Sequence, residues 1–433
     1  MRVTRSFHIE SIPRFKDAIL LWAQQFEQVA WLDSNFHNDR HGVFEGILAV
    51  DSQTSLSVKT CKNIDEAKDF YDETQDWLFG YFSYDFKNAL EKLESTNHDG
   101  LGFPELYFFQ PRKVIGFKAH MVTFMYMDSV ADAIESDFET IVGYDVRITD
   151  HRQQIDHVKI KLRIHKDEYF DRIAQLQHYI QRGNIYEANF CQECYAVDTS
   201  IDPLSTYLRL NSISEPPFAV FFRFDDKFLL SASPERYLQK KGDTIVSQPI
   251  KGTAPRSDDP HQDNVFKMQL QIDGKERAEN IMIADLVRND LSRSALKGSV
   301  IVEELCKVYS FKQVHQMIST ITAKVDPDQH PMDIIAETFP MGSMTGAPKI
   351  AAMKIIEELE VTKRGLYSGA VGYFDPKGNF DFNVVIRSIL YNATKKYISY
   401  SVGSAITAKS IPESEYEECL LKAKAMRSVL EEG

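Results

Sequence analysis

The chain lacks long apolar runs. Its 433 residues contain no uninterrupted apolar stretch of the roughly 18 residues that a membrane-spanning helix requires. The first residues, MRVTRSFHIESIPRF, have no continuous apolar core of the kind found in a secretory signal. We therefore expect a cytoplasmic protein with no membrane partner.

Positive charge is also in short supply. Lysine and arginine together number 50 against 63 aspartates and glutamates, which leaves a net charge of −13. This balance argues against nucleic acid as a partner, because nucleic-acid binding needs a basic surface. An anionic small ligand would need a local cluster of Lys or Arg side chains, or a metal ion, to overcome the mean field.

Cysteine is sparse. The five cysteines form an odd set, which predicts reduced thiols in the cytosol rather than a disulfide framework. Cys191 and Cys194 make a lone Cys-x-x-Cys pair. A structural zinc site needs about four ligands at suitable spacing, and no further candidates accompany this pair. We therefore expect structural thiols.

Against these absences, hydrophobic residues make up 43% of the chain, which is enough for a substantial core. Apolar spacing predicts helices at 166–182, Asp273–Leu291, from near Ala347, and at Ser414–Leu430. Alternating and β-branched runs predict strands at Gly46–Val50, Leu78–Ser83, Val122–Met127, Phe218–Phe224, Lys227–Ser231, Gly369–Phe374, Phe382–Tyr391 and Tyr397–Val402. No regular βαβ alternation connects them, which predicts an α+β fold.

The run Gln-Pro-Ile-Lys-Gly-Thr at 248–253 is the most informative segment. Its Lys251 follows Glu235, in Ser-Pro-Glu, by sixteen residues. An amine can attack carbon or take a proton, and a carboxylic acid can protonate a leaving group. Lys251 and Glu235 therefore form a candidate catalytic pair.

Two pairs of glutamates form a candidate metal site. Glu276 and Glu279 lie three residues apart in a predicted helix, as do Glu415 and Glu418, so each pair shares a helix face. Two such pairs that meet would bind a hard cation such as Mg²⁺, which takes one or two carboxylates together with water and substrate oxygens. Acidic pairs are also common on solvated helix faces, and spacing alone favours that second interpretation.

Thr345 lies in the run Gly-Ser-Met-Thr-Gly-Ala-Pro-Lys at 342–349, which is not a phosphate loop because no Gly-Lys-Ser/Thr follows. Thr345 is placed to cap a helix, with Pro348 in its first turn. The free N–H groups of that turn would either bind an anion or simply mark the start of a helix.

Arg387 and His315 are polar residues next to or within apolar runs. Arg387 lies inside the predicted strand Phe382–Tyr391, and a buried arginine needs either a core carboxylate or an anionic ligand. A lone histidine such as His315 is more often a satisfied core residue than a functional group.

Taken together, these segments resemble the chorismate-utilising enzymes, which include the anthranilate, aminodeoxychorismate, isochorismate and salicylate synthases. The resemblance covers about residues 165–433, and the matching runs follow the family's order: SPERY at 233–237, PIKGTAPR at 249–256, ERAENIMIADLVRNDLSR at 276–293, then VHQMISTITA, ETFPMGSMTGAPKIAAMKIIEELE, RGLYSGAVGYF, VIRS and SEYEECLLKA. The N-terminal part matches more loosely, through WLDS at 31–34 and GYFSYDF at 80–86.

The resemblance implies a large intertwined, two-lobed β-sandwich core of antiparallel sheets with helices outside. It also implies two regions. Residues 1–155 resemble the N-terminal region of anthranilate synthase component I, and residues 156–433 resemble the chorismate-binding catalytic region. The WLDS stretch roughly resembles the family's tryptophan-binding segment.

Two segments indicate a branch of the family. Isochorismate and salicylate synthases carry a water-activating lysine where this chain reads GNIYEANFCQE, so the chain resembles the ammonia-using branch. Anthranilate synthases have Pro-Ile-Ala-Gly-Thr where this chain and the aminodeoxychorismate synthases have Pro-Ile-Lys-Gly-Thr. The resemblance therefore implies Mg²⁺-dependent amination of chorismate to aminodeoxychorismate, for p-aminobenzoate and folate synthesis. Anthranilate synthase component I and, more distantly, a non-catalytic chorismate-binding subunit are the alternatives.

The resemblance also implies residue roles. Lys251 attacks the chorismate ring at C2, Glu235 protonates the departing 4-hydroxyl, and His315 orients the ring. Mg²⁺ on Glu279 and Glu418, with Glu276 and Glu415 in support, holds one carboxylate of the substrate. The substrate's other polar groups are assigned to Thr345, Tyr367, Arg387, Gly403 and Lys422.

Two further expectations concern the nitrogen source and a departure from the family. The chain has no Gly-x-Cys-x-Gly nucleophile of a glutaminase, so we expect ammonia from a separate glutamine amidotransferase subunit or from solution. The sequence reads Val402-Gly403-Ser404-Ala405 where the family usually has a Gly-Ala-Gly or Gly-Gly-Gly turn that approaches a substrate carboxylate.

Overall fold

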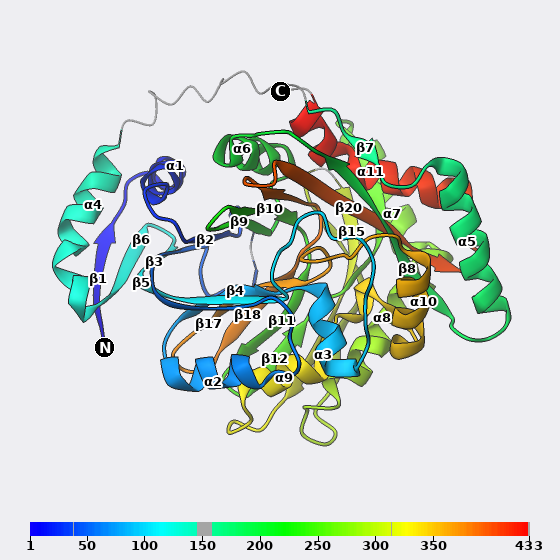
Figure 1. The fold of residues 1–433 in the computed structure, drawn as a ribbon, viewed down its shortest axis with the longest axis horizontal. Helices are drawn as coiled ribbons and strands as arrows, with labels where there is room; N and C mark the ends of the chain where they lie inside the picture. Colours follow the sequence, from blue (N-terminus) through cyan, green and yellow to red (C-terminus); the bar gives the residue numbers. More distant parts are fainter. Residues whose placement is uncertain (38, 145–157, 313, 432–433) are drawn as a thin grey trace.

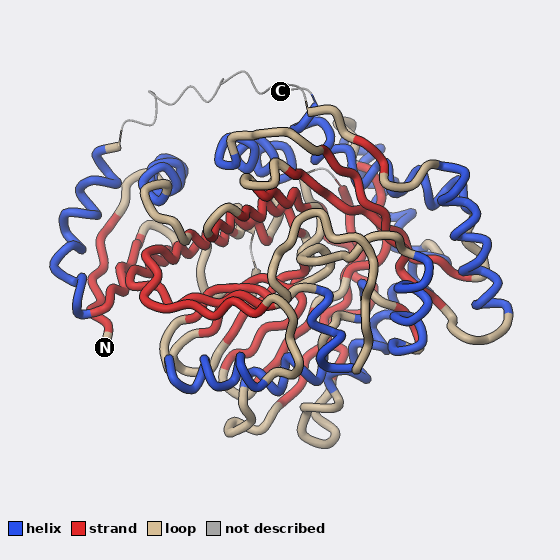
Figure 2. Tube along the Cα trace, in the orientation of Figure 1, coloured by secondary structure: helices blue, strands red, loops and turns tan. Residues whose placement is uncertain are grey.

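Antiparallel sheet dominates the structure. The computed structural model describes residues 1–433 except residues 38, 145–157, 313 and 432–433. Within the described residues, 20 strands join by hydrogen bonding into one continuous sheet system, and the helices lie around its outside (Figures 1 and 2). The predicted α+β class with an antiparallel core is confirmed.

The first part of the chain contains both strands and short helices. They are β1 (Arg2–His8), α1 (Ile12–Ala23), β2 (Val29–Asp33), β3 (Gly46–Val58), α2 (Asp65–Thr74), β4 (Leu78–Phe82), α3 (Lys87–Glu91), β5 (Leu106–Lys118), β6 (Met121–Met127) and α4 (Ile134–Gly143). The middle of the chain carries β7 (Lys161–Leu162), α5 (Lys166–Gln181), β8 (Glu187–Ala196), α6 (Pro203–Ser214), β9 (Phe218–Phe224), β10 (Lys227–Ser233), β11 (Arg236–Lys241), β12 (Thr244–Ser247), β13 (Ile250–Pro255), α7 (Pro260–Ile272) and α8 (Gly274–Leu291).

The last third completes the sheets. Its elements are β14 (Ile301–Ser310), β15 (Val314–Lys324), α9 (Pro331–Thr338), the 3₁₀ turn η4 (Gly342–Met344), β16 (Gly346–Ala347), α10 (Lys349–Leu359), β17 (Ala370–Phe374), β18 (Phe380–Val384), β19 (Ser388–Asn392), β20 (Tyr397–Thr407) and α11 (Pro412–Glu431).

Strands that are distant in sequence pair directly. Strand β4 pairs with β17, so that Gly80 lies opposite Gly372, and β2 pairs with β9. The N-terminal elements therefore belong to the same sheet system as the C-terminal ones. The predicted boundary between residues 155 and 156 lies outside the described residues.

The sheets are buried on both faces. In β2, Val29 and Trp31 belong to one hydrophobic core, whereas Ala30 between them belongs to a second core. Successive side chains of a strand point to opposite faces, so this strand separates the two cores. Its continuous apolar run is typical of a strand that is covered on both sides.

Three predicted helices are confirmed, and each begins and ends within two residues of the predicted positions. Helix α5 and helix α11 match the apolar spacing. Helix α8 begins after Asp273, whose carboxylate accepts hydrogen bonds from the backbone N–H groups of Lys275 and Glu276. A capping aspartate of this kind satisfies N–H groups that a helix start leaves free.

Two predictions of local structure are wrong. The strand expected at Phe382–Tyr391 is two strands, β18 and β19, because Arg387 has a φ of 53° and this left-handed conformation breaks the ladder. Thr345 does not cap a helix. Its hydroxyl lies against the carbonyl oxygens of Met341 and Gly342, and α10 begins at Lys349 with Pro348 as its N-cap.

The cysteines agree with the sequence prediction. All five are buried and free, and Cys191 and Cys194 lie in β8. Within the described ranges, no helix combines the length and apolarity that crossing a membrane requires.

Candidate active site

A cavity of about 270 Å³ lies between β13, β15, β20, α8 and α11. It gathers ten of the twelve residues that the sequence nominated, from segments far apart in the chain. These are Glu235, Lys251, Glu276, Glu279, Tyr367, Arg387, Gly403, Glu415, Glu418 and Lys422. His315 and Thr345 do not line it.

Lys251 lies at an irregularity of β13. The pairing of β13 with β15 shifts register between Ile250 and Thr253, and such bulges re-aim side chains next to active sites. Gly252 has a φ of 97°, a conformation that glycine adopts without steric cost. The amide of Asn280, on α8, donates to the Lys251 carbonyl oxygen at 3.0 Å and fixes this segment against the helix.

The Lys251 amine has a carboxylate partner. Its Nζ lies 3.4 Å from Oε1 of Glu187, whose side chain is 2% exposed. Burial by itself lowers the pKa of Lys251, but the carboxylates of Glu187, Glu279, Glu418 and Glu235 outweigh it and raise the pKa above its ordinary value. Lys251 is therefore an ammonium group when the cavity holds no other charge, and it must lose a proton before it can act as a nucleophile.

Glu235 has the properties of a general acid. Its side chain is buried, and burial raises the pKa of its carboxyl to about 7, although Ser343, Lys251 and the backbone N–H of Ile250 act in the opposite direction. A carboxylic acid with such a pKa is about half protonated at pH 7, whereas an ordinary glutamate is almost fully ionised there, so Glu235 can donate a proton to a leaving group.

All four glutamates line the cavity, so they are not simply part of solvated helix faces. Lys275 places its Nζ 3.8 Å from Oε1 of Glu279, on α8, and 3.9 Å from Oε1 of Glu415, on α11. Among the residues that the structure describes, no three His, Cys, Asp or Glu side chains are already gathered tightly enough to hold a metal ion. The lysine ammonium nevertheless lies where these oxygens attract a cation, so the donor set fits a hard divalent ion.

Two positive groups, Arg387 and Lys422, also line the cavity. The left-handed conformation of Arg387 occurs at the break between β18 and β19, and burial lowers the pKa of its guanidinium from the ordinary value. In the described part of the chain, Arg387 forms no ion pair with a carboxylate, so its charge is available to an anion. Nζ of Lys422 lies 2.6 Å from Glu418 Oε1 and donates to the Gly403 carbonyl oxygen at 2.8 Å.

His315 and Thr345 are core residues. The His315 ring is fully buried, with Nε2 3.0 Å from Asp263 Oδ1 and Nδ1 2.9 Å from the Ser310 hydroxyl. Both ring nitrogens therefore have protein partners outside the cavity. Thr345 is also fully buried, and its neighbours Ser343 and Met344 line the cavity instead.

Three residues that the sequence analysis did not nominate belong to this site. Glu187 pairs with Lys251, and Gln316 and Ser343 line the cavity. The amide oxygen of Gln316 is buried and has no hydrogen-bond partner, which is uncommon in folded proteins. One sequence signal points to Gln316: it follows His315 directly, and adjacent strand residues face opposite sides.

A buried ion pair supports the wall of the cavity. The Arg364 guanidinium makes two hydrogen bonds to the Glu360 carboxylate, at 2.9 and 2.7 Å. It also donates to the carbonyl oxygens of Met344 and Asn189, both at 2.7 Å. These bonds connect η4, β8 and the end of α10 at a fixed separation.

Comparison with known proteins agrees with this arrangement. A family model described as chorismate binding enzyme matches residues 27–428. The chain belongs to this family. The aminodeoxychorismate synthase component 1 of Escherichia coli is 32% identical over 369 residues, which cover 82% of this chain and 77% of the relative. An anthranilate synthase component I-like protein of Synechocystis is 32% identical over 380 residues, or 86% of this chain and 76% of the relative.

A solved structure shows the same fold in the chorismate binding enzyme family. Anthranilate synthase component I from Streptococcus pneumoniae superposes with a TM-score of 0.76 over 90% of this chain and 95% of the other, at 24% sequence identity. The predicted resemblance to the chorismate-utilising enzymes is confirmed.

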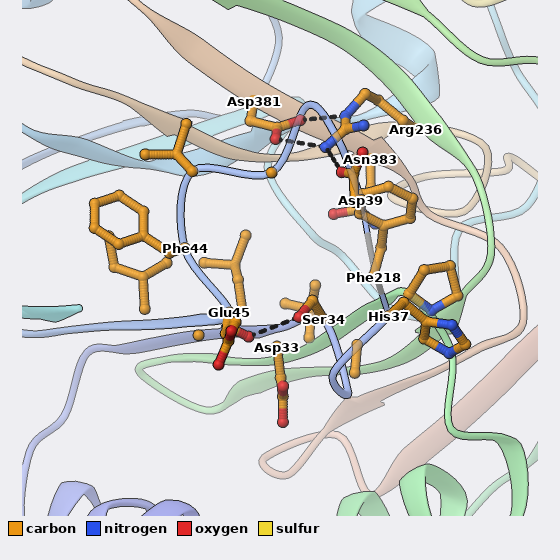
Figure 3. A pocket seen from close by; sticks show the side chains of 18 of the residues that line it. Asp33, Ser34, His37, Asp39, Phe44, Glu45, Phe218, Arg236, Asp381 and Asn383 are labelled. Atoms are coloured by element: carbon orange, nitrogen blue, oxygen red, sulfur yellow. Dashed lines mark hydrogen bonds and ion pairs between the residues drawn. The ribbon is translucent and has the colours of Figure 1, made fainter. Parts of the chain in front are cut away.

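A second cavity of about 390 Å³ lies elsewhere in this chorismate binding enzyme (Figure 3). The WLDS stretch contributes Leu32, Asp33 and Ser34 to its lining, whereas Trp31 is fully buried in the core. Arg236, at its edge, makes ion pairs with Asp39 and Asp381 at 2.6 and 2.9 Å (Figure 3). This cavity shares no lining residue with the one around Lys251.

Proposed function

We propose that the protein is the large subunit of an aminodeoxychorismate synthase, which converts chorismate and ammonia into 4-amino-4-deoxychorismate for p-aminobenzoate and folate synthesis. The observation that carries the proposal is the lysine amine of Lys251 in one cavity with the buried acid Glu235. An amine nucleophile and a protonated acid allow substitution at a ring carbon through a covalent intermediate.

The reaction has two steps. The neutral amine of Lys251 adds to ring C2, the ring double bonds shift, and the C4–O bond breaks while Glu235 gives its proton to the departing hydroxyl. Glu187 is the nearest carboxylate to the amine, at 3.4 Å, and takes the proton that Lys251 must lose. Ammonia then forms a bond to C4, the ring double bonds shift back, the C2–Nζ bond breaks, and one proton of the new ammonium passes to the Lys251 amine. The enolpyruvyl group stays attached, so no pyruvate is released.

The substrate's negative charge is matched by local positive charge. Chorismate carries two carboxylates, and Arg387 and Lys422 face the cavity in which they would lie. Tyr367, whose hydroxyl accepts a weak hydrogen bond from Cys191 Sγ at 3.8 Å, adds a polar contact. These groups provide the local positive charge that an anionic ligand needs in a protein with a net charge of −13.

A magnesium ion is part of the proposal. Glu279 and Glu418, supported by Glu276 and Glu415, would hold it at the acidic end of the cavity. When bound, the ion supplies the positive charge that holds one substrate carboxylate. When the ion binds, Glu279 and Glu415 must give up their contacts with Lys275.

We expect Glu279→Gln to weaken Mg²⁺ binding by about 10-fold or more, because a neutral amide replaces a charged ligand. Isothermal titration of the protein with MgCl₂ alone measures this affinity without turnover. Glu417→Gln is the matched control, since Glu417 is an exposed residue of α11 outside the cavity. Equal Mg²⁺ affinity in the two variants would contradict the assignment of Glu279 as a ligand.

The ammonia source is proposed to be a separate glutamine amidotransferase subunit. The name of the Escherichia coli relative, component 1, supports an enzyme that works with a second component. Ammonium salts in solution would replace that partner in an assay.

The decisive experiment mixes the protein with chorismate, MgCl₂ and an ammonium salt. We expect aminodeoxychorismate to accumulate without release of pyruvate, as measured by liquid chromatography with mass detection and a coupled pyruvate assay. Anthranilate and pyruvate as main products would overturn the proposal in favour of anthranilate synthase, the activity that the names of the Synechocystis and Streptococcus pneumoniae proteins contain.

A further inference from the structure

The side chain of Gln316 lines the cavity and contains a hydrogen-bond acceptor that no protein group uses. Its side chain is 3% exposed, and the amide oxygen Oε1 is buried without a partner. Gln316 lies on β15, between Thr253 of β13 and Tyr309 of β14 in the ladder. Because strands pair with β15 on both sides, the backbone that carries this amide is rigidly held.

A small side chamber opens beside Gln316. Its volume is about 50 Å³, compared with about 270 Å³ for the main cavity. The two spaces share five lining residues: Pro234, Val314, Gln316, Arg387 and Lys422. One water needs about 10–15 Å³ on this kind of measure, so the chamber has room for a few molecules of that size but not for a substituted ring.

The walls of the side chamber favour a small neutral molecule. Most of its other lining residues are apolar: Leu210, Pro216, Pro217, Ala232, Phe311, Ala425 and Met426. Two charged side chains line it, Arg387 and Lys422. Lys422 is paired with Glu418, whereas Arg387 has no carboxylate partner among the described residues and repels an ammonium ion. A buried acceptor such as Gln316 Oε1 gains free energy when a donor reaches it, because it is otherwise left unsatisfied.

We propose that Gln316 is the positioning residue for the nitrogen nucleophile, a neutral ammonia molecule that waits in this side chamber. The proposal rests on the proposed function. Ammonia has N–H donors and one lone pair, and a hydrogen bond from one N–H to Oε1 leaves the lone pair free to attack C4. As the C4–N bond forms, the C2–Nζ bond breaks, its electron pair returns to Lys251, and one proton of the new ammonium passes to that amine.

Gln316→Met tests the proposal because it removes the acceptor at similar volume. We expect the KM for ammonium to rise on the order of 10-fold, the factor that corresponds to one lost hydrogen bond, while the KM for chorismate stays within about 2-fold of wild type. Covalent capture of the ring on Lys251 without ammonium should be unchanged, which also shows that the variant is folded. Gln316→Glu keeps an acceptor and should restore the ammonium KM.

Gln192→Met is the matched control. Gln192 is also a buried glutamine with an unpartnered Oε1, but it lies on β8 outside the lining of both spaces, and its replacement should leave the ammonium KM unchanged. An unchanged ammonium KM in Gln316→Met, or a raised KM for chorismate instead, would overturn the proposal. The ammonium KM is read from whichever aminated product forms. Anthranilate as product would refute the proposed function and the attack at C4, while the KM comparison would still decide whether Gln316 positions the ammonia.

Discussion

Replacing Lys251 with alanine is expected to eliminate the covalent adduct between the protein and the chorismate ring. Lys251 is the amine that the bulge of β13 turns into the cavity, and without it no nucleophile remains to displace the 4-hydroxyl. Turnover should fall by about 10⁴-fold or more, as it does when other enzymes lose their nucleophile. Intact-protein mass spectrometry after mixing with chorismate and Mg²⁺, without ammonium, measures the adduct directly.

The control for this experiment is Lys424→Ala. Lys424 is an exposed residue of α11, two positions from Lys422, and lies outside the cavity lining. The adduct should form on this variant as it does on the wild type. A ring adduct that persists in Lys251→Ala would exclude Lys251 as the nucleophile.

Replacing Glu235 with glutamine should lower kcat/KM by about 10² to 10⁴-fold, the range typical of a lost general acid. It should also change the pH dependence. Burial raises the pKa of Glu235 to about 7, so the carboxyl is protonated below that pH and loses its proton above it. The wild-type rate should therefore fall as the pH rises above about 7, and this limb should be missing in Glu235→Gln.

Glu105→Gln serves as the matched control for the pH profile. Glu105 is also a buried carboxyl whose pKa is raised by burial, but it accepts a hydrogen bond from the Cys61 backbone N–H away from the cavity. The alkaline limb should persist in this variant. If the limb also persists in Glu235→Gln, then the titrating acid is another group.

Elements with strong local patterns could be predicted from the sequence. Helix α8 carries its own capping aspartate, Asp273, and strand β9 is an unbroken apolar run. Strand β1 was not predicted, because its residues are mostly exposed or half-buried and show no clear alternation. The division of β18 from β19 depends on the left-handed conformation of Arg387, which no residue type signals, since arginine rarely adopts it.

The sequence predicts the chemical groups of the site but not every residue that belongs to it. Lys251 and Glu235 are a candidate pair by their residue types, whereas the glutamate pairs could be assigned to the site only through the resemblance to the family, because their spacing alone favours solvated helix faces. The choice between His315 and Gln316 depends on which face of β15 meets the cavity. A shift of one residue in register exchanges the two faces, and register is set by pairing with β13 and β14. Glu187 could not be predicted, because its partner, Lys251, is distant in the sequence.

The pairing of β4 with β17 has a consequence for how the chain is made. During synthesis, β4 leaves the ribosome long before its partner exists, so the early strands present unpaired edges until the last quarter of the chain appears. Contacts between residues so far apart slow folding, and exposed strand edges favour aggregation in the meantime. We therefore expect the yield of folded protein to respond to chaperones and to the speed of translation more than that of a protein built from successive independent domains.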